Sequence, residues 1–189
     1  MDLNIDFGQP AKGKLLISEP FLPDPSFKRT VVLLTEHNEQ GSVGFVLNRP
    51  LDIPINEAVL NFPHFDALLS AGGPVQPDTL HYIHTMGKSL EKSIEVIDGL
   101  FWGGDFESMK ALIISGKATP EDFKFFVGYS GWSAGQLDDE MKSRSWIVAD
   151  ATLDNVFHMD PENLWRSILK NMGTKYSVIS NFPEDPSFN

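Results

Sequence analysis

The sequence predicts a single α+β domain built around a mixed, largely antiparallel sheet. Apolar, strand-like segments follow one another through short turns instead of alternating with helices, which is typical of hairpins. The helix-like segments, about three to four, lie mostly in the second half of the chain. The 189 residues, 41% of them hydrophobic, suffice for one core and for one domain over residues 1–189. So many short strands are also compatible with a partly closed, barrel-like sheet.

Apolar and β-branched runs predict the strands of the first half of the chain. Residues 30–36 (TVVLLTE) and 42–48 (SVGFVLN) flank a polar turn that ends at Gly41, which makes them the clearest hairpin. Asp98-Gly99 is a strong two-residue hairpin signal between two further strands. In chain order we expect strands at residues 13–18, 30–36, 42–48, 67–71, 79–85, 93–97 and 100–103.

Capping residues and helix breakers mark the helices. Asp105 can cap a helix that ends at Gly116, and Asp160-Pro161 opens another that ends at Gly173. In chain order we expect a short helix within residues 52–62, a helix over 105–116, a single capped turn at 119–122, a strand at 123–129, helices over 133–143 and 160–173, a strand at 176–182, and a frayed end at about 183–189.

The charge balance argues against a protein that binds nucleic acid by itself. The chain has 26 acidic and 15 basic residues, a net charge of −11, and its densest basic sites are pairs such as Lys28-Arg29. Because proteins that neutralise phosphates cluster their lysines and arginines, direct nucleic-acid binding is not expected. The sequence leaves open a local basic patch created by folding.

Several kinds of site are excluded or disfavoured by what the sequence lacks. Without cysteine the chain has no disulfide, no thiolate metal ligand and no cysteine nucleophile. The same lack of cysteine favours a cytoplasmic location. Residues 1–6 include two acidic side chains and do not resemble a signal peptide. No run approaches the ~18 apolar residues of a membrane span, so we expect no membrane association.

Residues 131–135 (GWSAG) match the G-x-S-x-G pattern of serine hydrolases, between a predicted strand and a predicted helix. In that alternative Ser133 is the nucleophile and His158 is the base, while Asp150 or Asp154 orients the base. The predicted hairpins argue against this alternative, because the α/β-hydrolase fold needs a mostly parallel sheet.

A structural explanation of the same motif competes with hydrolysis. Ser133 followed by Gln136 forms a capping-box pattern, which satisfies backbone N–H groups at the start of a helix. Trp132 would then pack against Leu137 as a hydrophobic staple. We favour the cap and assign no catalytic residue, so an enzymatic role remains the less favoured alternative.

The histidines do not suggest a metal site. His81 and His84 lie in a predicted strand, and their spacing places them on opposite faces of the sheet. The other histidines, His37, His64 and His158, have no partner at the ligand spacing of a helix. The glycine pairs match no phosphate-binding loop. We therefore expect no metal ion and no bound cofactor.

A set of short motifs spreads over about residues 13–173. The motifs are residues 23–32 (PDPSFKRTVV), 36–38 (EHN), 44–51 (GFVLNRPL), 72–74 (GGP), 84–85 (HT), 128–132 (GYSGW) and 135–140 (GQLDDE). Taken together, they resemble the AlgH/YqgE family. The family pattern G-W-x-x-G-Q-L-E does not require serine at Ser133, which weakens the hydrolase hypothesis. Asp138 stands where the family usually has glutamate.

The resemblance implies an intracellular bacterial protein of one α+β domain, from a family largely without an established biochemical activity. The family name carries a role in the transcriptional regulation of exopolysaccharide synthesis. We therefore expect a non-enzymatic binding or regulatory protein that acts through another protein or a small ligand, not by contacting DNA. Because loops and strand ends concentrate binding residues, the candidate recognition surface comprises His37, Asn48, His84, Trp132 and Gln136.

Overall fold

The computed structural model describes residues 5–184 of the chain. Its ten strands form one sheet whose ladders run in the order β10-β1-β2-β3-β9-β6-β8-β7, with β5 pairing both β4 and β9. The strands are β1 Lys14–Ser18, β2 Val31–Asn38, β3 Gly41–Val46, β4 Pro50–Pro54, β5 Leu68–Ala71, β6 Val75–His84, β7 Ile94–Ile97, β8 Leu100–Trp102, β9 Phe123–Ser133 and β10 Trp146–Asp150. Among the strand pairs of the described residues only β5–β9 is parallel, which confirms the mixed, largely antiparallel α+β prediction.

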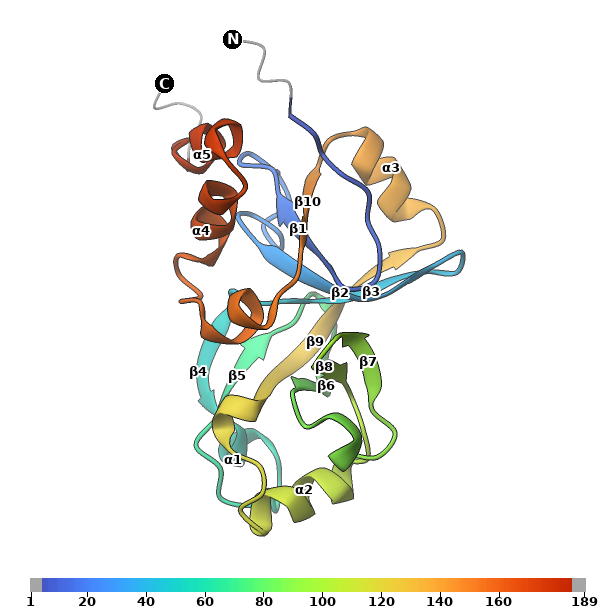
Figure 1. The fold of residues 1–189 in the computed structure, drawn as a ribbon, viewed down its shortest axis with the longest axis vertical. Helices are drawn as coiled ribbons and strands as arrows, with labels where there is room; N and C mark the ends of the chain where they lie inside the picture. The colour runs from blue at the N-terminus through green and yellow to red at the C-terminus, as the bar shows by residue number, and fades with distance from the viewer. Residues whose placement is uncertain (1–4, 185–189) are drawn as a thin grey trace.

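Eight helical segments accompany the sheet within the described residues. They are the α-helices α1 Ile55–Ala58, α2 Phe106–Ile114, α3 Gln136–Lys142, α4 Leu164–Asn171 and α5 Thr174–Ser180, the 3-10 turns Gly87–Ser89 and Pro120–Asp122, and a π-helix at Asp154–His158. In Figure 1, α1 and α2 lie with β4–β8 in the lower part of the molecule, whereas α3, α4 and α5 lie with β1, β2, β3 and β10 in the upper part. No helix in this part of the chain is long and apolar enough to cross a membrane.

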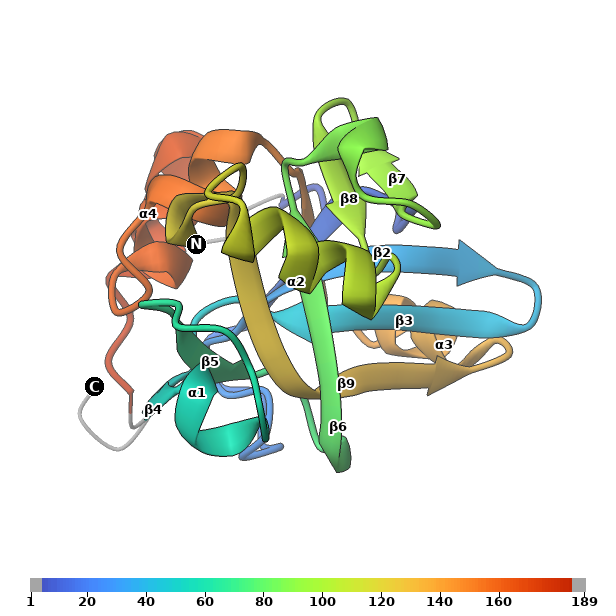
Figure 2. The ribbon, with the colours of Figure 1, turned by 90° about the horizontal axis from the view of Figure 1, so that it is seen from below.

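Strand β9 belongs to both parts of the molecule (Figures 1 and 2). Its first half pairs with β5 and β6, and its last residues pair with β3. Gly128 marks the changeover, with a φ of +67°, and a Cβ there would lie 2.7 Å from the carbonyl oxygen of Gly73. Glycine is therefore required where β9 passes from one group of strands to the other.

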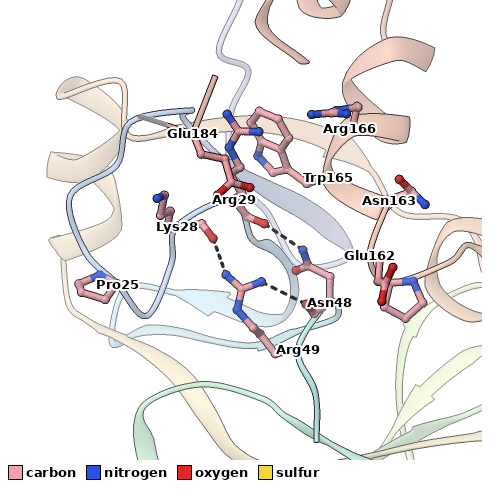
Figure 3. Close-up of a pocket in the computed structure, with 11 residues that line it drawn as sticks. Pro25, Lys28, Arg29, Asn48, Arg49, Glu162, Asn163, Trp165, Arg166 and Glu184 are labelled. Carbon is pink, nitrogen blue, oxygen red and sulfur yellow. Dashed lines mark hydrogen bonds between the residues drawn. The ribbon is translucent and has the colours of Figure 1, made fainter. Parts of the chain in front are cut away.

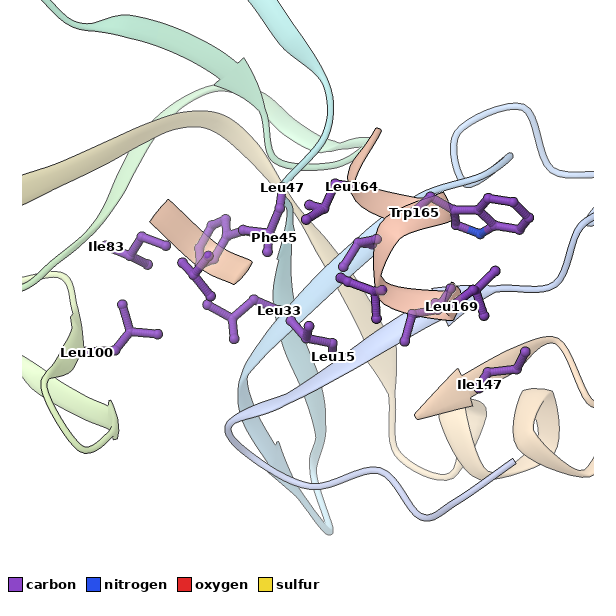
Figure 4. Packing of buried hydrophobic residues seen from close by; sticks show 14 of the residues in the cluster. Leu15, Leu33, Phe45, Leu47, Ile83, Leu100, Ile147, Leu164, Trp165 and Leu169 are labelled. Atoms are coloured by element: carbon purple, nitrogen blue, oxygen red, sulfur yellow. The ribbon is translucent and has the colours of Figure 1, made fainter. Parts of the chain in front are cut away.

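Both faces of β1 and β2 are covered, which explains why their sequences are apolar without alternation. Leu15 and Leu33 pack into a cluster that includes Trp165 of α4 (Figure 4). Leu16 and Val32 point the other way, into a cluster completed by α3 and β10. A third cluster, rich in phenylalanine, lies between the sheet and the helices α1 and α2.

The structure corrects the barrel-like alternative. The sheet begins at β10 and ends at β7, and no described ladder joins these two strands. The physical reason is the changeover in β9, which sends the chain into two differently oriented groups of strands instead of one closing ring.

The sequence predicted three of the four longer α-helices of the described residues, namely α2, α3 and α4, but not their observed bounds. The segment 176–182, expected as a strand, is largely helix α5, which packs against α4 and buries Ile179. The predicted helix at 133–143 begins only at Gln136, because β9 runs on to Ser133. The capped turn at 119–122 is confirmed as a 3-10 turn with a capping box. Of the expected frayed end, residues 185–189 lie outside the described residues.

Candidate functional site

A pocket of about 510 Å³ opens where four segments meet: the loop between β1 and β2, the link between β3 and β4, the start of α4, and the residues after α5 (Figure 3). Four of its eleven lining residues are basic. They are Lys28, Arg29, Arg49 and Arg166, beside the carboxylates of Glu162 and Glu184. We call this site the basic pocket.

Asn48 connects the segments that form the basic pocket. Its side chain is buried, with 8% exposure. The Oδ1 atom accepts a hydrogen bond from the backbone N–H of Val31 at 3.0 Å, and Nδ2 donates to the carbonyl of Arg29 at 2.9 Å. Arg29 has a φ of 51°, a left-handed conformation that is unfavourable for a residue with a side chain. The hydrogen bond from Asn48 therefore stabilises a strained backbone at the rim of the pocket.

The Arg29 side chain is fixed on two sides. Its Nη2 donates to the carbonyl of Phe182 at 2.6 Å, and its guanidinium lies 4.8 Å from the ring centre of Trp165. The indole is itself fixed, because its Nε1 donates to the carbonyl of Ser18 at 2.9 Å. The Nε atom of Arg29 is buried and has no hydrogen-bond partner among the described residues.

The charges around Arg29 act on its pKa in opposite directions. Burial lowers the pKa most, Glu184 raises it, and the neighbouring Arg166 lowers it. Arginine nevertheless stays protonated at every pH at which proteins fold, so the pocket keeps this positive charge.

Arg49 binds the opposite wall of the basic pocket. Its Nη1 donates to the carbonyl of Asn48 at 3.2 Å, and its Nη2 donates to the carbonyl of Lys28 (Figure 3). Burial lowers the pKa of this guanidinium as well. Both arginines are therefore positioned by backbone carbonyls, which neutralise no charge.

The basic pocket carries uncompensated positive charge. The salt bridges found between described residues all lie elsewhere, so none of the four cations is paired with a described carboxylate. Two more cations than carboxylates line the pocket, in a chain whose net charge is −11. Guanidinium groups bind carboxylate and phosphate through paired hydrogen bonds, so this arrangement suits an anion.

Of the five residues expected to form a recognition surface, only Asn48 lines the basic pocket. Trp132 and Gln136 lie together at another place, where both bind Glu140. Glu140 Oε2 accepts from Trp132 Nε1 at 2.9 Å and from Trp146 Nε1 at 2.8 Å, and Oε1 accepts from Gln136 Nε2 at 3.1 Å. This carboxylate joins β9, α3 and β10. The sequence does not indicate this role, because Glu140 follows two other acidic residues.

The two remaining candidates lie apart from each other. His37, at the end of β2, is 2.7 Å from Ser42 through its Nδ1, and Ser42 pairs with Trp132 in the neighbouring strand. His84 is fully buried in the lower part of the molecule. The structure therefore brings His37 near Trp132 but does not place the five residues on one surface.

The hydrogen bonds of His84 indicate the tautomer of its neutral ring. The backbone N–H of Met86 donates to Nδ1 at 3.2 Å, so the ring proton is on Nε2, which lies 2.9 Å from the carbonyl of Gly103. Burial lowers the pKa of His84, and the hydrogen bond to Gly103 opposes this shift. His81 faces the other side of β6, against Phe45, as the spacing predicted. No described group of three or more histidines and carboxylates has a metal-binding arrangement.

Ser133 is the last residue of β9 and contacts the helix that follows. Its Oγ lies 3.3 Å from Gln136 Oε1, which also accepts from the backbone N–H of Ser133 at 3.0 Å. No hydrogen bond between described residues joins Ser133 to His158, Asp150 or Asp154. Half of the predicted capping box is present, but the N-cap of α3 is Gly135, not Ser133, because the chain needs a left-handed residue after the strand.

A family model described as AlgH-like matches residues 15–177. A UPF0301 protein of Chlorobium limicola is 45% identical over 97% of this chain and 98% of its own length. A UPF0301 protein of Cytophaga hutchinsonii is 44% identical over 94% of this chain and 98% of its own length.

Two solved structures have the same fold. The solution structure of the AlgH protein from Pseudomonas aeruginosa is 30% identical, with a TM-score of 0.72 over 95% of this chain and 98% of that chain. A crystal structure of a protein from Corynebacterium diphtheriae is 20% identical, with a TM-score of 0.75 over 94% of this chain and 95% of that chain. The second likeness concerns the fold alone.

Proposed function

The chain belongs to the AlgH-like family, and from that premise we propose that it is a non-enzymatic binding protein whose basic pocket receives an anionic group. The ligand is a carboxylate- or phosphate-bearing molecule, or an acidic part of a partner protein. Any role in regulating transcription is then exerted through that partner, in the cytoplasm. The basic surface of a single pocket is too small to bind along a nucleic-acid backbone.

The observation that carries this proposal is the convergence of four cations without a paired carboxylate. Clustered like charges repel one another, and the repulsion is relieved when an anion binds. Arg29 and Arg49 are also fixed in place before any ligand arrives, through their hydrogen bonds to Phe182, Asn48 and Lys28. A preorganised site binds with a smaller loss of side-chain entropy.

Both arginines retain unused hydrogen-bond donors. A guanidinium has five N–H groups. Arg29 uses one of them on Phe182, and Arg49 uses two, on Asn48 and Lys28. Apart from the buried Nε of Arg29, the remaining donors and the ammonium of Lys28 can bind the oxygens of one anionic group.

Inorganic phosphate is the simplest probe of this proposal. Titration into ¹⁵N-labelled full-length protein is expected to shift the amide signals of Arg29, Asn48 and Arg49 in a saturable way. The double variant Lys28→Gln/Arg166→Gln should abolish the response, because it removes two exposed charges without disturbing a described hydrogen bond.

A control is Lys117→Gln, which removes one exposed charge three residues after α2, outside the basic pocket. This variant should bind phosphate as the unaltered chain does. Phosphate shifts that are absent, or that persist in Lys28→Gln/Arg166→Gln, would refute anion binding at the basic pocket.

A further inference from the structure

The segment that follows α5 lies on the rim of the basic pocket. The backbone N–H of Phe182 donates to the carbonyl of Ile179 at 3.1 Å, which turns the chain at the end of the helix. The carbonyl of Phe182 then accepts the hydrogen bond from Arg29 Nη2 at 2.6 Å. The ring of Phe182 stacks on Phe21, with centroids 5.9 Å apart and planes 15° apart.

Glu184 extends this segment into the lining of the basic pocket, where Figure 3 shows its side chain beside Arg29. The carboxylate is close enough to raise the pKa of Arg29, yet it forms no salt bridge with it. The two residues thus attract each other through space without the paired hydrogen bonds that a bound carboxylate would make. Glu184 is exposed, so an incoming group can displace it.

Residues 182–184 therefore present two chemical features to the basic pocket: a peptide carbonyl on Arg29 and a carboxylate among the cations. The ring of Phe182 anchors the segment on Phe21, outside the lining of that pocket. We propose that this segment is a tethered occupant of the basic pocket, and that the ligand it imitates is an acidic peptide of a partner protein with an aromatic residue near its carboxylate. This inference rests on the proposed anion-binding function.

A tethered occupant sets a threshold for the partner. Because residues 182–184 are part of the same chain, they compete with the partner for the basic pocket at a high effective concentration. This competition raises the partner concentration that is needed to fill the pocket. Their contacts are few, so the competition is weak: exposed charge pairs contribute little, and the ring stack is at the surface. Releasing the segment should therefore strengthen binding of an acidic peptide roughly tenfold.

The test uses full-length protein and a fluorescent peptide with the sequence of residues 181–189 (NFPEDPSFN). Fluorescence anisotropy should show roughly tenfold tighter binding to Phe182→Ala/Glu184→Gln than to the unaltered chain. The single variant Glu184→Gln, which alters only an exposed side chain, should show part of the gain and does not depend on ring packing.

A matched control pair is Leu60→Ala/Glu121→Gln, which removes an exposed apolar side chain and an exposed carboxylate far along the chain from the basic pocket. It should bind the peptide as the unaltered chain does. Adding Lys28→Gln/Arg166→Gln to the released variant should abolish peptide binding. Peptides in which the phenylalanine at position 182 or the glutamate at position 184 is replaced by alanine should bind more weakly.

Each outcome separates this inference from the proposed function. Equal peptide affinity for the released variant and the unaltered chain would show that residues 182–184 do not occupy the site, while phosphate binding would still support the pocket. Phosphate binding without any peptide binding would overturn the peptide as ligand and favour a small anion. If neither phosphate nor peptide binds any variant, the proposed function itself is wrong.

Discussion

The side-chain amide of Asn48 donates to the carbonyl of Arg29 at 2.9 Å and accepts from the N–H of Val31 at 3.0 Å, so a single buried residue fixes both sides of one bend. The same bend places the Arg29 guanidinium over Trp165. The shape of the basic pocket therefore depends on a neutral residue that contributes no charge to it.

Replacing Asn48 by alanine should lower the free energy of unfolding by about 3 kcal/mol, because two buried backbone groups lose their partners. Urea denaturation measures the loss. The control Asn171→Ala, at an exposed position at the end of α4, should change stability by less than about 0.5 kcal/mol. A loss no larger than that of the control would mean that water or a rearranged loop satisfies both groups.

Replacing Glu140 by alanine should destabilise the protein by about 3 kcal/mol, because the buried indole N–H groups of Trp132 and Trp146 lose a shared acceptor. Glu140→Gln keeps one carbonyl oxygen and should cost less. Near-ultraviolet circular dichroism should report the change in tryptophan packing. Asp138→Asn, on the same helix but exposed, is the control. Unchanged spectra in Glu140→Ala would contradict the role assigned to this carboxylate.

Stability should fall as the pH drops below about 6.5, the ordinary pKa of histidine. Burial lowers the pKa of His84 in the folded protein, so the unfolded chain binds a proton more readily. The stability that His84 contributes is therefore complete above the unfolded pKa and is lost as pH falls toward the folded pKa.

Denaturation curves at pH 7 and pH 5 test this dependence. His84→Gln should have a smaller loss between the two pH values than the unaltered chain, although it is less stable at pH 7. The exposed His64→Gln should keep the full pH dependence. His81, whose pKa burial also lowers, leaves a residual dependence in His84→Gln. An identical pH dependence in His84→Gln and the unaltered chain would exclude His84 as a contributor.

Ser133 should not react with a fluorophosphonate probe in the folded protein. Its hydroxyl contacts Gln136, and no described base lies within hydrogen-bond reach of it. Mass spectrometry after incubation measures labelling, with a known serine hydrolase as positive control. Ser133→Ala should change the free energy of unfolding by less than about 1 kcal/mol, because the side chain is exposed. Specific labelling at Ser133 would revive the hydrolase hypothesis.

The strands that alternate with clear turns were predictable from sequence, because β-branched runs and the Asp98-Gly99 turn act locally. Strands β4 and β10 were missed. β10 (WIVAD) has an apolar run, but the long-range partner that makes it a strand, β1, lies near the other end of the chain. Helix α5 was taken for a strand, although Tyr176, Ile179 and Ser180 have helical spacing and Ile179 and Ser180 are buried.

The candidate site was only partly visible in the sequence. The pair Lys28-Arg29 was its densest basic feature, and Asn48-Arg49 belonged to a motif of the resembled family. Their meeting with Arg166 depends on how α4 packs over β1 and β2, which no local pattern encodes. No local pattern indicates the role of Glu140, because the two indoles that bind it come from separate strands.

The pairing of β1 with β10 also constrains how the chain is made. Lys14 and Ser18 are opposite Asp150 and Trp146, so the outer edge of β1 has no strand beside it until the ribosome has added residue 150. The inner edge can pair with β2 much earlier. A nascent chain stalled before Trp146 therefore exposes a row of unpaired backbone groups on an apolar strand. Chaperones can bind this exposed strand, and aggregation can begin there during synthesis.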